Sequence, residues 1–568
     1  MKIKSQLSII IKQALKSANI DSKDVDITIS DSTKPQFGDY QFNGIMKLAK
    51  RLKQNPRVIA LDVIGHIDKA DIIDKVEVAG PGFINIWLSS RWLAIQATSI
   101  IDDKRVGVGF KDKPSRVVVD YSGPNMAKQM HVGHLRSSII GDSIASLLEF
   151  LGDEVIRQNH IGDWGTQFGM LIAYLEELGE DRNSQNLQDL EQFYREAKVR
   201  FDQSEEFANR AREYVVKIQQ GDRYCLGLWR KFIDISLGHC EEVYSKLGVK
   251  LTRDDVRAES FYNPRLPKVI ETLKDKGLLV DSNGAKCLFL DNSNTPIIVQ
   301  KSDGGYLYAT TDLAGLEFRA KELKADRICY VVDARQSEHF RQVFKIARLA
   351  DMVSDSVKLE HIAFGTMMDK SGKPFKTRDG GTVKLIDLLD EAILRAKKTI
   401  KERNNHSEDE LNSVANAIGI GAVKYADLSI NRESNYIFSW DKMLSFDGNT
   451  ALYMQYAYAR IQSIFRKYTK ELNGIITIGD RLEHKLALMI LKFEDTLIKA
   501  SVDGYPHIIT SYLYELVTLF MKFYEQNSIL KDNIPTETQI SRLLLAKLTA
   551  NVIKKGLDIL GIKVVDRI

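Results

Sequence analysis

The sequence has little that would take the protein into or across a membrane. No stretch of its 568 residues approaches the roughly 20 uninterrupted apolar residues that span a bilayer. Its start, MKIKSQLSIIIKQALKSANI, contains neither the apolar core nor the small-residue cleavage site of a secretory signal. We therefore expect a cytoplasmic protein that makes no membrane contact.

Cysteine is also scarce, with only Cys225, Cys240, Cys287 and Cys329. They form no CxxC pair and no cysteine–histidine spacing typical of zinc, so we expect no protein-bound zinc. Four thiols permit two disulfides, but a large chain without an export signal favours reduced cysteines.

An excess of one charge is nearly absent, since 80 Lys and Arg residues and 76 Asp and Glu residues give a net charge of +4. Residues 1–88 have 13 basic and 10 acidic side chains, and residues 449–568 have 16 and 12. Basic flanks suit a polyanion bound at both ends, although a random scatter of solvated charges explains them equally well. The length indicates more than one domain, because single cores stop growing at roughly 250–300 residues.

Residues 1–88 have the mixed pattern of a small α+β domain. Apolar residues recur at helical spacing in SQLSIIIKQALKSA and in PRVIALDVIGHI. In VEVAGPGFINIWLS they alternate on either side of a Pro-Gly turn, as in paired strands. The segment DDKRVGVGFKDKPS, rich in Lys, Gly and Asp, marks a boundary after this domain.

Residues 113–448 begin with the strand, loop and helix of a nucleotide-binding α/β unit. The β-branched run RVVVDYS fits a buried parallel strand, and HLRSSIIGDSIASLLEFLG has apolar residues at helical spacing. Further strands are predicted at RICYVVD and KLEHIAFGT. We predict a Rossmann-type parallel-sheet catalytic domain with insertions.

Residues 449–568 change to long amphipathic patterns joined by short polar connections. No period of 20–50 residues is visible, so we predict a C-terminal all-α helical bundle rather than a solenoid. Four helices are expected, at ALYMQYAYARIQSIFRKY, HKLALMILKFEDTLIKA, HIITSYLYELVTLFMKFYEQ and ISRLLLAKLTANVIKKGLDIL.

The strongest chemical signal is SGPNMAKQMHVGHLRS, at residues 122–137. His131 and His134 lie one turn apart where the loop enters the predicted helix, so both imidazoles can point from the helix N-terminus towards a phosphate. Gly133 leaves room for a base or ribose beside the backbone. Such a site suits the charge that builds on ATP when a carboxylate attacks its α-phosphorus. Histidines at this spacing also occur on surfaces and in metal sites, but the preceding strand favours the catalytic interpretation.

The same stretch resembles the HIGH signature of class I aminoacyl-tRNA synthetases, in the form typical of arginyl-tRNA synthetases. The likeness extends over nearly the whole chain. Five further segments resemble that family in the same order: NHIGDWGTQFG (159–169), YLYATTDLAGLEFR (306–319), VVDARQSEHF (331–340), GKPFKTRDGGTVKL (372–385) and the run from 419 to 463. The resemblance implies a monomeric arginine–tRNA ligase that uses ATP with Mg²⁺, activates L-arginine as arginyl-adenylate, and transfers it to the 3′ end of tRNA(Arg).

The resemblance also implies an arginine pocket, and the residues supply suitable chemistry for one. Arginine is a planar cation with five donors, so its pocket needs acceptors and at least one carboxylate. Asp312 can pair with the guanidinium, and Tyr308 lies on the same face if the segment is helical. Gln336 follows a predicted strand, where α/β folds place ligand groups. Asp120 and Asn125 match positions that hold the backbone groups of the amino acid.

The second signature of class I enzymes is a loop, KMSKS, whose lysines neutralise the triphosphate. The matching segment here, KPFKT, keeps Lys373 and Lys376 but changes the other residues. Lys128 matches the family's substitute cation. The resemblance implies that His131, His134, Lys128 and Lys376 are catalytic, and that His131, Gly133, His134, Lys373 and Lys376 bind ATP.

The outer parts of the chain resemble domains of the same family that bind tRNA. The bundle at 449–568 resembles an anticodon-binding domain, and residues 1–88 resemble an N-terminal domain that contacts the tRNA elbow. Tyr453, Tyr456 and Tyr458 can stack on unpaired anticodon bases, although aromatic residues at this spacing also occur in helix cores.

Three alternatives remain open from the sequence. They are a synthetase for another amino acid, a small HxGH nucleotidyltransferase, and an inactive relative that only binds RNA. The scattered cysteines disfavour a zinc-dependent cysteinyl enzyme, and a small nucleotidyltransferase needs neither the KPFKT loop nor the outer domains. Intact His131, His134, Lys376 and Asp312 disfavour an inactive relative. The resemblance further implies that arginine activation requires bound tRNA.

Overall fold

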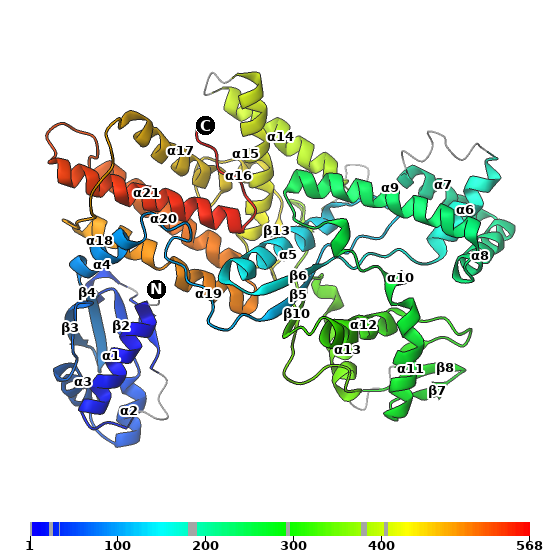
Figure 1. Cartoon of the computed structure of the whole chain (residues 1–568), viewed down its shortest axis with the longest axis horizontal. Helices are drawn as coiled ribbons and strands as arrows, with labels where there is room; N and C mark the ends of the chain where they lie inside the picture. Colours follow the sequence, from blue (N-terminus) through cyan, green and yellow to red (C-terminus); the bar gives the residue numbers. More distant parts are fainter. Residues whose placement is uncertain are drawn as a thin grey trace.

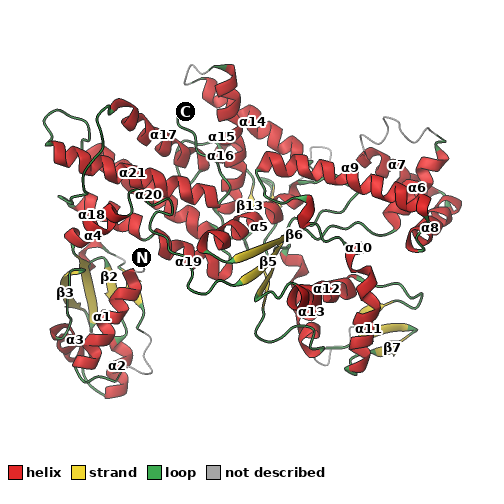
Figure 2. Cartoon of the chain, viewed as in Figure 1, coloured by secondary structure: helices red, strands yellow, loops and turns green. Residues whose placement is uncertain are grey.

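The computed structural model shows a long molecule with a small domain and a helical bundle at one end, a parallel sheet in the middle and a helical arm at the other end (Figure 1). Helices predominate outside the sheets (Figure 2). No helix within the described part is long and apolar enough to cross a membrane. The structure describes residues 3–21, 27–32, 34–179, 190–290, 296–375, 383–402 and 407–568.

The N-terminal part is an antiparallel sheet with helices packed against it, which confirms the predicted α+β pattern. Its four strands have the order β1-β2-β4-β3. The predicted strand pair is β3 and β4, joined by a turn in which Gly80 and Gly82 have φ of 53° and 144°. The elements are α1 (Ile3–Ser17), β1 (Ile29–Asp31), β2 (Tyr40–Phe42), α2 (Ile45–Leu52), α3 (Pro56–Gly65), β3 (Ile73–Ala79), β4 (Phe83–Leu88) and the following helix α4 (Ser90–Ser99).

Four parallel strands form the central sheet, in the order β11-β10-β5-β6, as predicted for a Rossmann-type domain. Their carboxyl ends meet at one edge, where Asp120 lies in register with Gln158 and Tyr330. Helix α5 packs closely on the end of β5, because a Cβ on Gly141 would lie 2.3 Å from the Tyr121 Cβ. The elements are β5 (Arg116–Asp120), α5 (Val132–Leu151), β6 (Glu154–Gln158), β10 (Arg327–Tyr330), α13 (Ser337–Leu349) and β11 (Lys358–His361).

Two insertions separate β6 from β10. The first is a helical arm that extends to the right in Figure 1, and the second carries a small antiparallel sheet and leads into α12. The arm is α6 (Thr166–Glu177), α7 (Leu190–Gln203), α8 (Glu205–Gln219) and α9 (Arg223–Leu247). The second insertion is α10 (Glu259–Tyr262), α11 (Leu266–Asp275), β7 (Val280–Ser282), β8 (Ala285–Leu288), β9 (Ile297–Gln300) and α12 (Tyr308–Glu317).

The C-terminal part is all-helical, but it contains five long helices where the sequence predicted four. The second predicted helix is interrupted at Lys492, because its first half packs against α4, α20 and α21 and its second half against α5 and α20. The bundle is α17 (Ala451–Lys467), α18 (Arg481–Leu491), α19 (Phe493–Asp503), α20 (His507–Gln526) and α21 (Thr536–Ile559). It is reached from β11 through β12 (Met367–Met368), α14 (Leu385–Lys401), α15 (Glu408–Leu428), β13 (Tyr436–Ile437) and α16 (Trp440–Met443).

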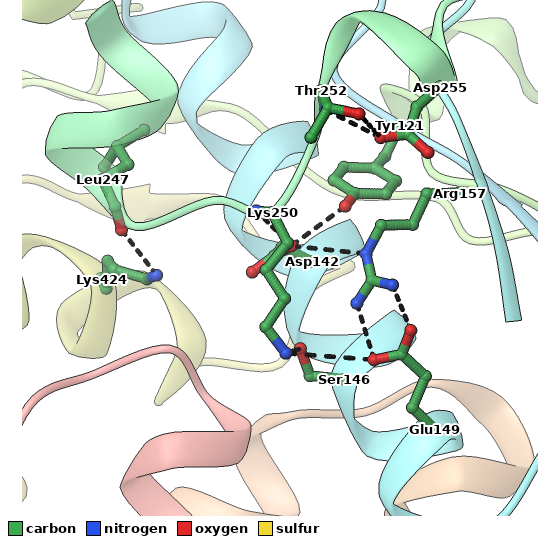
Figure 3. A network of polar contacts seen from close by, with 10 residues as sticks. All are labelled: Tyr121, Asp142, Ser146, Glu149, Arg157, Leu247, Lys250, Thr252, Asp255 and Lys424. Atoms are coloured by element: carbon green, nitrogen blue, oxygen red, sulfur yellow. Dashed lines mark hydrogen bonds and ion pairs between the residues drawn. The ribbon is translucent and has the colours of Figure 1, made fainter. Parts of the chain in front are cut away.

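Helix α5 lies where these parts meet. One cluster of buried side chains includes Val117 of β5, Ile144 of α5 and Leu548 of α21. On the polar side of α5, Asp142 accepts hydrogen bonds from the Tyr121 hydroxyl and the Lys250 amide, each at 3.0 Å (Figure 3). Packing and polar contacts therefore fix this helix from several elements at once.

Candidate active site

The two predicted histidines begin helix α5 and cap it. The Nδ1 of His131 accepts a hydrogen bond from the Gly133 amide at 3.0 Å. The Nδ1 of His134 accepts one from the His131 amide at 3.1 Å, and the two ring centroids lie 4.1 Å apart. A nitrogen that accepts carries no proton, so a neutral ring in this arrangement has its proton on Nε2. Both rings therefore offer an Nε2–H donor to a ligand.

The surroundings keep both imidazoles neutral at physiological pH. Burial lowers the pKa of His134 to about 3, and the neighbouring His131 adds to the shift. Burial also lowers the pKa of His131, followed by the effect of nearby Lys128. The sequence suggested that both imidazoles point from the helix N-terminus towards a phosphate, and the free amides of a helix N-terminus also favour an anion. The caps instead occupy two of these amides, so the donors left for a phosphate are the Nε2–H groups.

Gly133 makes this cap possible. A Cβ at that position would lie 2.7 Å from Cε1 and 2.9 Å from Nδ1 of His131. Any other residue would therefore push the His131 ring away from its hydrogen bond. Gly133 is also exposed, so a ligand can approach the backbone there.

A cavity of about 200 Å³ adjoins His131 on the side of Lys128. Lys128 is exposed, and its Nζ lies 5.2 Å from the centre of the Tyr194 ring. The Nζ of Lys384 lies 3.5 Å from the carboxylate of Glu191. The cavity therefore has two lysines, of which the sequence motifs indicated only Lys128. Its lining is Lys128, Gln129, Met130, His131, Glu191, Tyr194, Arg195 and Lys384.

The second signature loop is held at both ends. At its start, the ring of Phe375 lies 4.7 Å from that of Phe438. After it, the Val383 carbonyl accepts a hydrogen bond from the Val132 amide at 3.1 Å. The chain therefore returns from this loop directly beside the histidine pair.

The first lysine of KPFKT, Lys373, lies in a tight turn. Lys373 is exposed, and its backbone carbonyl accepts a hydrogen bond from the Asp369 amide at 2.7 Å, in a tight turn before the loop. Lys376 lies outside the described residues.

Buried Arg136 connects the histidine helix to the base of that loop. Its Nε donates to Asp427 at 2.9 Å, and its guanidinium donates to the carbonyls of Gly365 at 2.5 Å and Ser434 at 3.1 Å. Gly365 lies just before β12. The two signature regions are therefore joined through one buried side chain.

Asp120, at the end of β5, is paired with an arginine of the protein itself. Its Oδ2 accepts a hydrogen bond from Arg319 at 2.7 Å, and Arg319 also donates to Gln158 at 2.6 Å. Arg319 lies in a π-helical turn, Phe318–Glu322, at the end of α12. The other oxygen of Asp120 accepts from the His160 amide at 3.3 Å. Both carboxylate oxygens thus already have partners in the protein.

Asn125 lies exposed in the loop between β5 and α5, opposite Gly162. A Cβ on Gly162 would lie 2.4 Å from Oδ1 of Asn125, so the glycine admits this side chain. In the same segment Asn159 accepts a hydrogen bond from the Gly123 amide at 3.0 Å. Residues 159–169 therefore pack against the loop that carries Asn125.

Asp312 lies on α12, one turn after Tyr308, and is bonded to His339, which lies in the segment 331–340 but was not predicted as a site residue. Oδ2 of Asp312 lies 2.6 Å from Nε2 of His339, with the side chains 19% and 29% exposed. His339 is on α13, three residues after Gln336. Tyr308 is 73% exposed, and Gln336 is exposed as well. Tyr308 and Asp312 thus lie on α12, Gln336 lies just before α13, and His339 bonds across the junction where these two helices pack together.

Two further carboxyl groups interact with this region. Burial, followed by the charges of Asp163 and Asp312, raises the pKa of Glu259 to about 7. Burial also raises the pKa of Asp163, whose carboxylate accepts from the Ser260 amide at 2.9 Å and hydroxyl at 2.5 Å. A carboxyl whose pKa is raised by the charges of two neighbouring carboxylates forms, with them, a suitable site for a cation. A single acidic residue has no spacing signal, so sequence alone did not indicate them.

The three predicted tRNA-binding tyrosines of α17 differ in exposure. Tyr453 and Tyr456 are half-buried, and Tyr458 is 8% exposed. The guanidinium of Arg460 lies 5.7 Å from the Tyr456 ring centre. Burial leaves Tyr458 no open face for a base, because it packs in the bundle core. Tyr453 and Tyr456 retain the exposure that stacking needs.

Comparison with known proteins finds three family models in sequence along the chain. The model for the catalytic domain of class I (R) tRNA synthetases matches residues 96–440. The arginyl-tRNA synthetase N-terminal domain matches residues 5–88, and the DALR anticodon-binding domain matches residues 454–568. Together they account for most of the chain.

Whole-chain relatives agree with these matches. The chain is 53% identical to an arginine–tRNA ligase of Chromobacterium violaceum over 565 residues, 98% of each chain. It is 52% identical to that of Haemophilus influenzae strain PittEE over 580 residues, which cover both chains completely.

Solved structures show the same likeness. The arginyl-tRNA synthetase of Plasmodium falciparum has a TM-score of 0.86 and 31% identity, covering 100% of this chain and 99% of that one. The arginyl-tRNA synthetase of Thermus thermophilus, 24% identical, shares the fold with a TM-score of 0.84 and complete coverage of both chains. Together with the family models and the whole-chain relatives, these matches place the chain in the arginyl-tRNA synthetase family of class I.

Proposed function

We propose that this protein joins L-arginine to tRNA(Arg) with the use of ATP. The observation that carries the proposal is that two neutral imidazole donors follow strand β5, while Asp312 is bonded to α13, which follows the neighbouring parallel strand β10. The donors suit a phosphate, and the carboxyls suit a guanidinium. Family membership supports the same reaction.

In the first step the carboxylate of arginine attacks the α-phosphorus of ATP, and pyrophosphate leaves. The Nε2–H groups of His131 and His134 donate to the phosphate oxygens, where negative charge increases in the transition state. Lys128 lies beside them, and Lys373 and Lys376 on the second loop contact the outer phosphates. Mg²⁺ accompanies ATP and neutralises part of the phosphate charge.

The guanidinium of arginine pairs with Asp312, next to Glu259, and the exposed Tyr308 covers it. Gln336 and Asn125 bind the amino and carboxylate groups of the amino acid. Asp120 acts through Arg319, which it holds at the floor of the site. An amino acid with a smaller, neutral side chain leaves these carboxylates without a cation, which disfavours its binding.

In the second step the 3′ ribose hydroxyl of the tRNA attacks the carbonyl carbon of arginyl-adenylate, and AMP leaves. We assign residues 1–88 and 449–568 to tRNA contacts, with Tyr453 and Tyr456 at the anticodon, and residues 113–448 to catalysis. The protein acts as a cytoplasmic monomer.

Exchange of labelled pyrophosphate into ATP tests this proposal directly. Each of the standard amino acids is assayed on protein treated with ribonuclease, and again after addition of tRNA(Arg). We expect arginine to be the one amino acid that supports exchange, and we expect this exchange only when tRNA is present. Exchange with a different amino acid would reassign the substrate, and brisk exchange without RNA would rule out the requirement for tRNA while leaving the substrate assignment intact.

A further inference from the structure

His339 touches the carboxylate that we assign to the arginine guanidinium. Its Nε2 lies 2.6 Å from Oδ2 of Asp312, a distance typical of a short, charge-assisted hydrogen bond. The His339 ring packs edge-on against Phe340 at 5.4 Å, and Phe340 in turn lies 4.9 Å from the ring of His361. The histidine is thus held on the pocket wall and faces Asp312.

We propose that the His339 imidazolium is an internal placeholder for the substrate: it pairs with Asp312 in the empty pocket, and bound arginine takes its place as His339 loses a proton. This inference rests on the proposed role of Asp312 as the partner of the guanidinium. His339 is then a positioning residue, because it acts on the substrate through Asp312.

The charges around His339 favour this exchange. Asp312 faces it from α12, and its hydrogen bond raises the pKa of His339 against the opposing effect of burial. Burial lowers the pKa of His361 on β11, with smaller effects from Arg432 and His339 itself. Of these two histidines, His339 is therefore the one that favours the positive charge, and His361 favours the neutral form.

Two carboxyls complete these surroundings. Glu259 on α10 has a pKa raised to about 7 by burial, Asp163 and Asp312, so it is half-protonated near neutral pH. Asp163 precedes α6 and is held by Ser260. The buried hydroxyl of Tyr330 on β10 has a pKa raised far above neutrality, so it does not titrate here.

The proton balance follows from these states. Arginine brings one positive charge to Asp312, and two cations on one partly buried carboxylate repel each other. His339 therefore releases its proton to solvent, and the carboxylic acid of Glu259 releases its own as the guanidinium arrives. Only N–H and O–H bonds are broken, and both protons go to water. In the empty pocket the placeholder pairs with the carboxylate of Asp312 and spares it the cost of a partly buried, unpaired charge.

The test is calorimetric titration of arginine into the full-length protein between about pH 6 and pH 8.5, with and without tRNA. Buffers of different ionisation enthalpy give the number of protons released. For each proton released, the association constant should rise by up to about tenfold per pH unit. The wild-type protein should release protons from both His339 and Glu259.

Variants separate the two groups. His339→Asn should release one proton fewer than the wild-type protein when arginine binds, so its arginine affinity should depend less steeply on pH. Its affinity near pH 6 should not fall below that of the wild type, because the competing cation is gone. His339→Lys keeps a cation throughout, so arginine should bind weakly at every pH. Glu259→Gln should retain the proton from His339. The matched control is His66→Asn, since His66 also neighbours an aspartate, Asp62 at 3.6 Å, but lies exposed in the N-terminal part.

A His339→Asn protein that releases as many protons as wild type, with the same pH profile, overturns the inference. If that variant does not fold, Glu259→Gln decides, because the absence of proton release there contradicts a placeholder at His339. Asp312→Asn separates this failure from failure of the proposed function. Unchanged arginine binding in that variant would show that Asp312 does not contact the guanidinium. A large loss of binding would support the assignment of Asp312 to the arginine pocket, whatever the result for His339.

Discussion

The two ring nitrogens of His134 have different partners, so their contributions can be separated by substitution. Nδ1 accepts the His131 amide, and we assign Nε2–H to the phosphate. An asparagine side chain places an acceptor near the position of Nδ1, and a glutamine side chain places a donor near that of Nε2.

We predict that His134→Asn keeps the cap but lowers the rate of adenylate formation by about 10²–10³, the usual loss for one donor to a developing charge. His134→Gln should lose less activity but melt at a lower temperature, because it lacks the cap. Aminoacylation rates and thermal melting measure the two effects. Full activity in His134→Asn together with a large loss in His134→Gln would show that the cap, and not the donor, is what catalysis needs.

Asp312→Asn should weaken arginine binding by roughly 2–5 kcal/mol, because the substitution removes the charge that pairs with a partly desolvated cation. ATP binding should change little. The KM values for arginine and for ATP, measured on this one variant, check the prediction. A loss confined to ATP would place Asp312 outside the amino-acid pocket.

At the scale of residues, the sequence predicted groups that belong to motifs. His131, His134 and Asp312 were found because each lies in a segment with a recognisable pattern. Glu259 lies in no such segment. His339 lies in the segment 331–340, but its importance comes from Asp312, which is far away in the sequence. The burial of Tyr458 also depends on tertiary packing, which helical spacing alone does not reveal.

A network of polar groups holds helix α5 in place (Figure 3). Asp142 on this helix bonds to Tyr121 and Lys250, and Glu149 pairs with Arg157 of β6. Near the same network, fully buried Lys424 of α15 donates to the Leu247 carbonyl at 2.9 Å. Burial lowers the pKa of Lys424 to about 8.

Lys424 should make stability depend on pH in an alkaline window. Between pH of about 8 and 10.5 the unfolded chain keeps a proton on Lys424 that the folded protein has released. The free energy of unfolding should therefore rise with pH in this window, by on the order of 3 kcal/mol from this group. Lys424→Met should lack the rise. Denaturant unfolding of both proteins across the window gives the difference, and parallel pH profiles would contradict the assignment.

At the scale of elements, three of the four strands of the central sheet were predictable. The central strands at 116–120 and 327–330 were indicated by their apolar runs, and the edge strand at 358–361 by the longer segment KLEHIAFGT. Strand β6, at the other edge of the sheet, is only partly buried and contains Glu154 and Arg157, so it has no such run. The break at Lys492 was missed because an amphipathic pattern continues through it while its packing partners change.

The outer parts of the molecule are attached in different ways. The N-terminal part contacts the bundle through polar pairs, such as Asp39 with His484 at 3.2 Å and Asp31 with Lys492 at 2.6 Å. Buried side chains of all three parts join one apolar cluster. The bundle, however, packs α19 and α21 directly on α5 of the central domain, where Ile144 lies near Gly504, while on its N-terminal side it packs mainly on α4, which follows residues 1–88. The three-part organisation was predictable from pattern changes, but this difference was not, because it depends on the packing of distant segments.

Deletions should reveal the difference. A chain without residues 1–88 should stay folded and bind arginine, but its tRNA affinity should fall. The slope of that affinity with salt should also become shallower, by about 1 for each tRNA phosphate that residues 1–88 neutralise.

A chain that ends near Phe446 should fail to fold, because it exposes the buried faces of α5 and α15. Solubility, thermal melting and tRNA binding at stated salt test both. A stable, soluble fragment ending at Phe446 would contradict the shared core.

The shared core also has a consequence during biosynthesis. Helix α5 packs against α21, so the helix that begins with the catalytic histidines cannot be fully covered until the last part of the chain has left the ribosome. At roughly 5–20 residues per second, nearly 400 residues of translation separate the two helices, a delay on the order of 20–80 s. During that time the nascent protein exposes apolar surface that chaperones bind, and a transcript truncated near its 3′ end should yield no active enzyme.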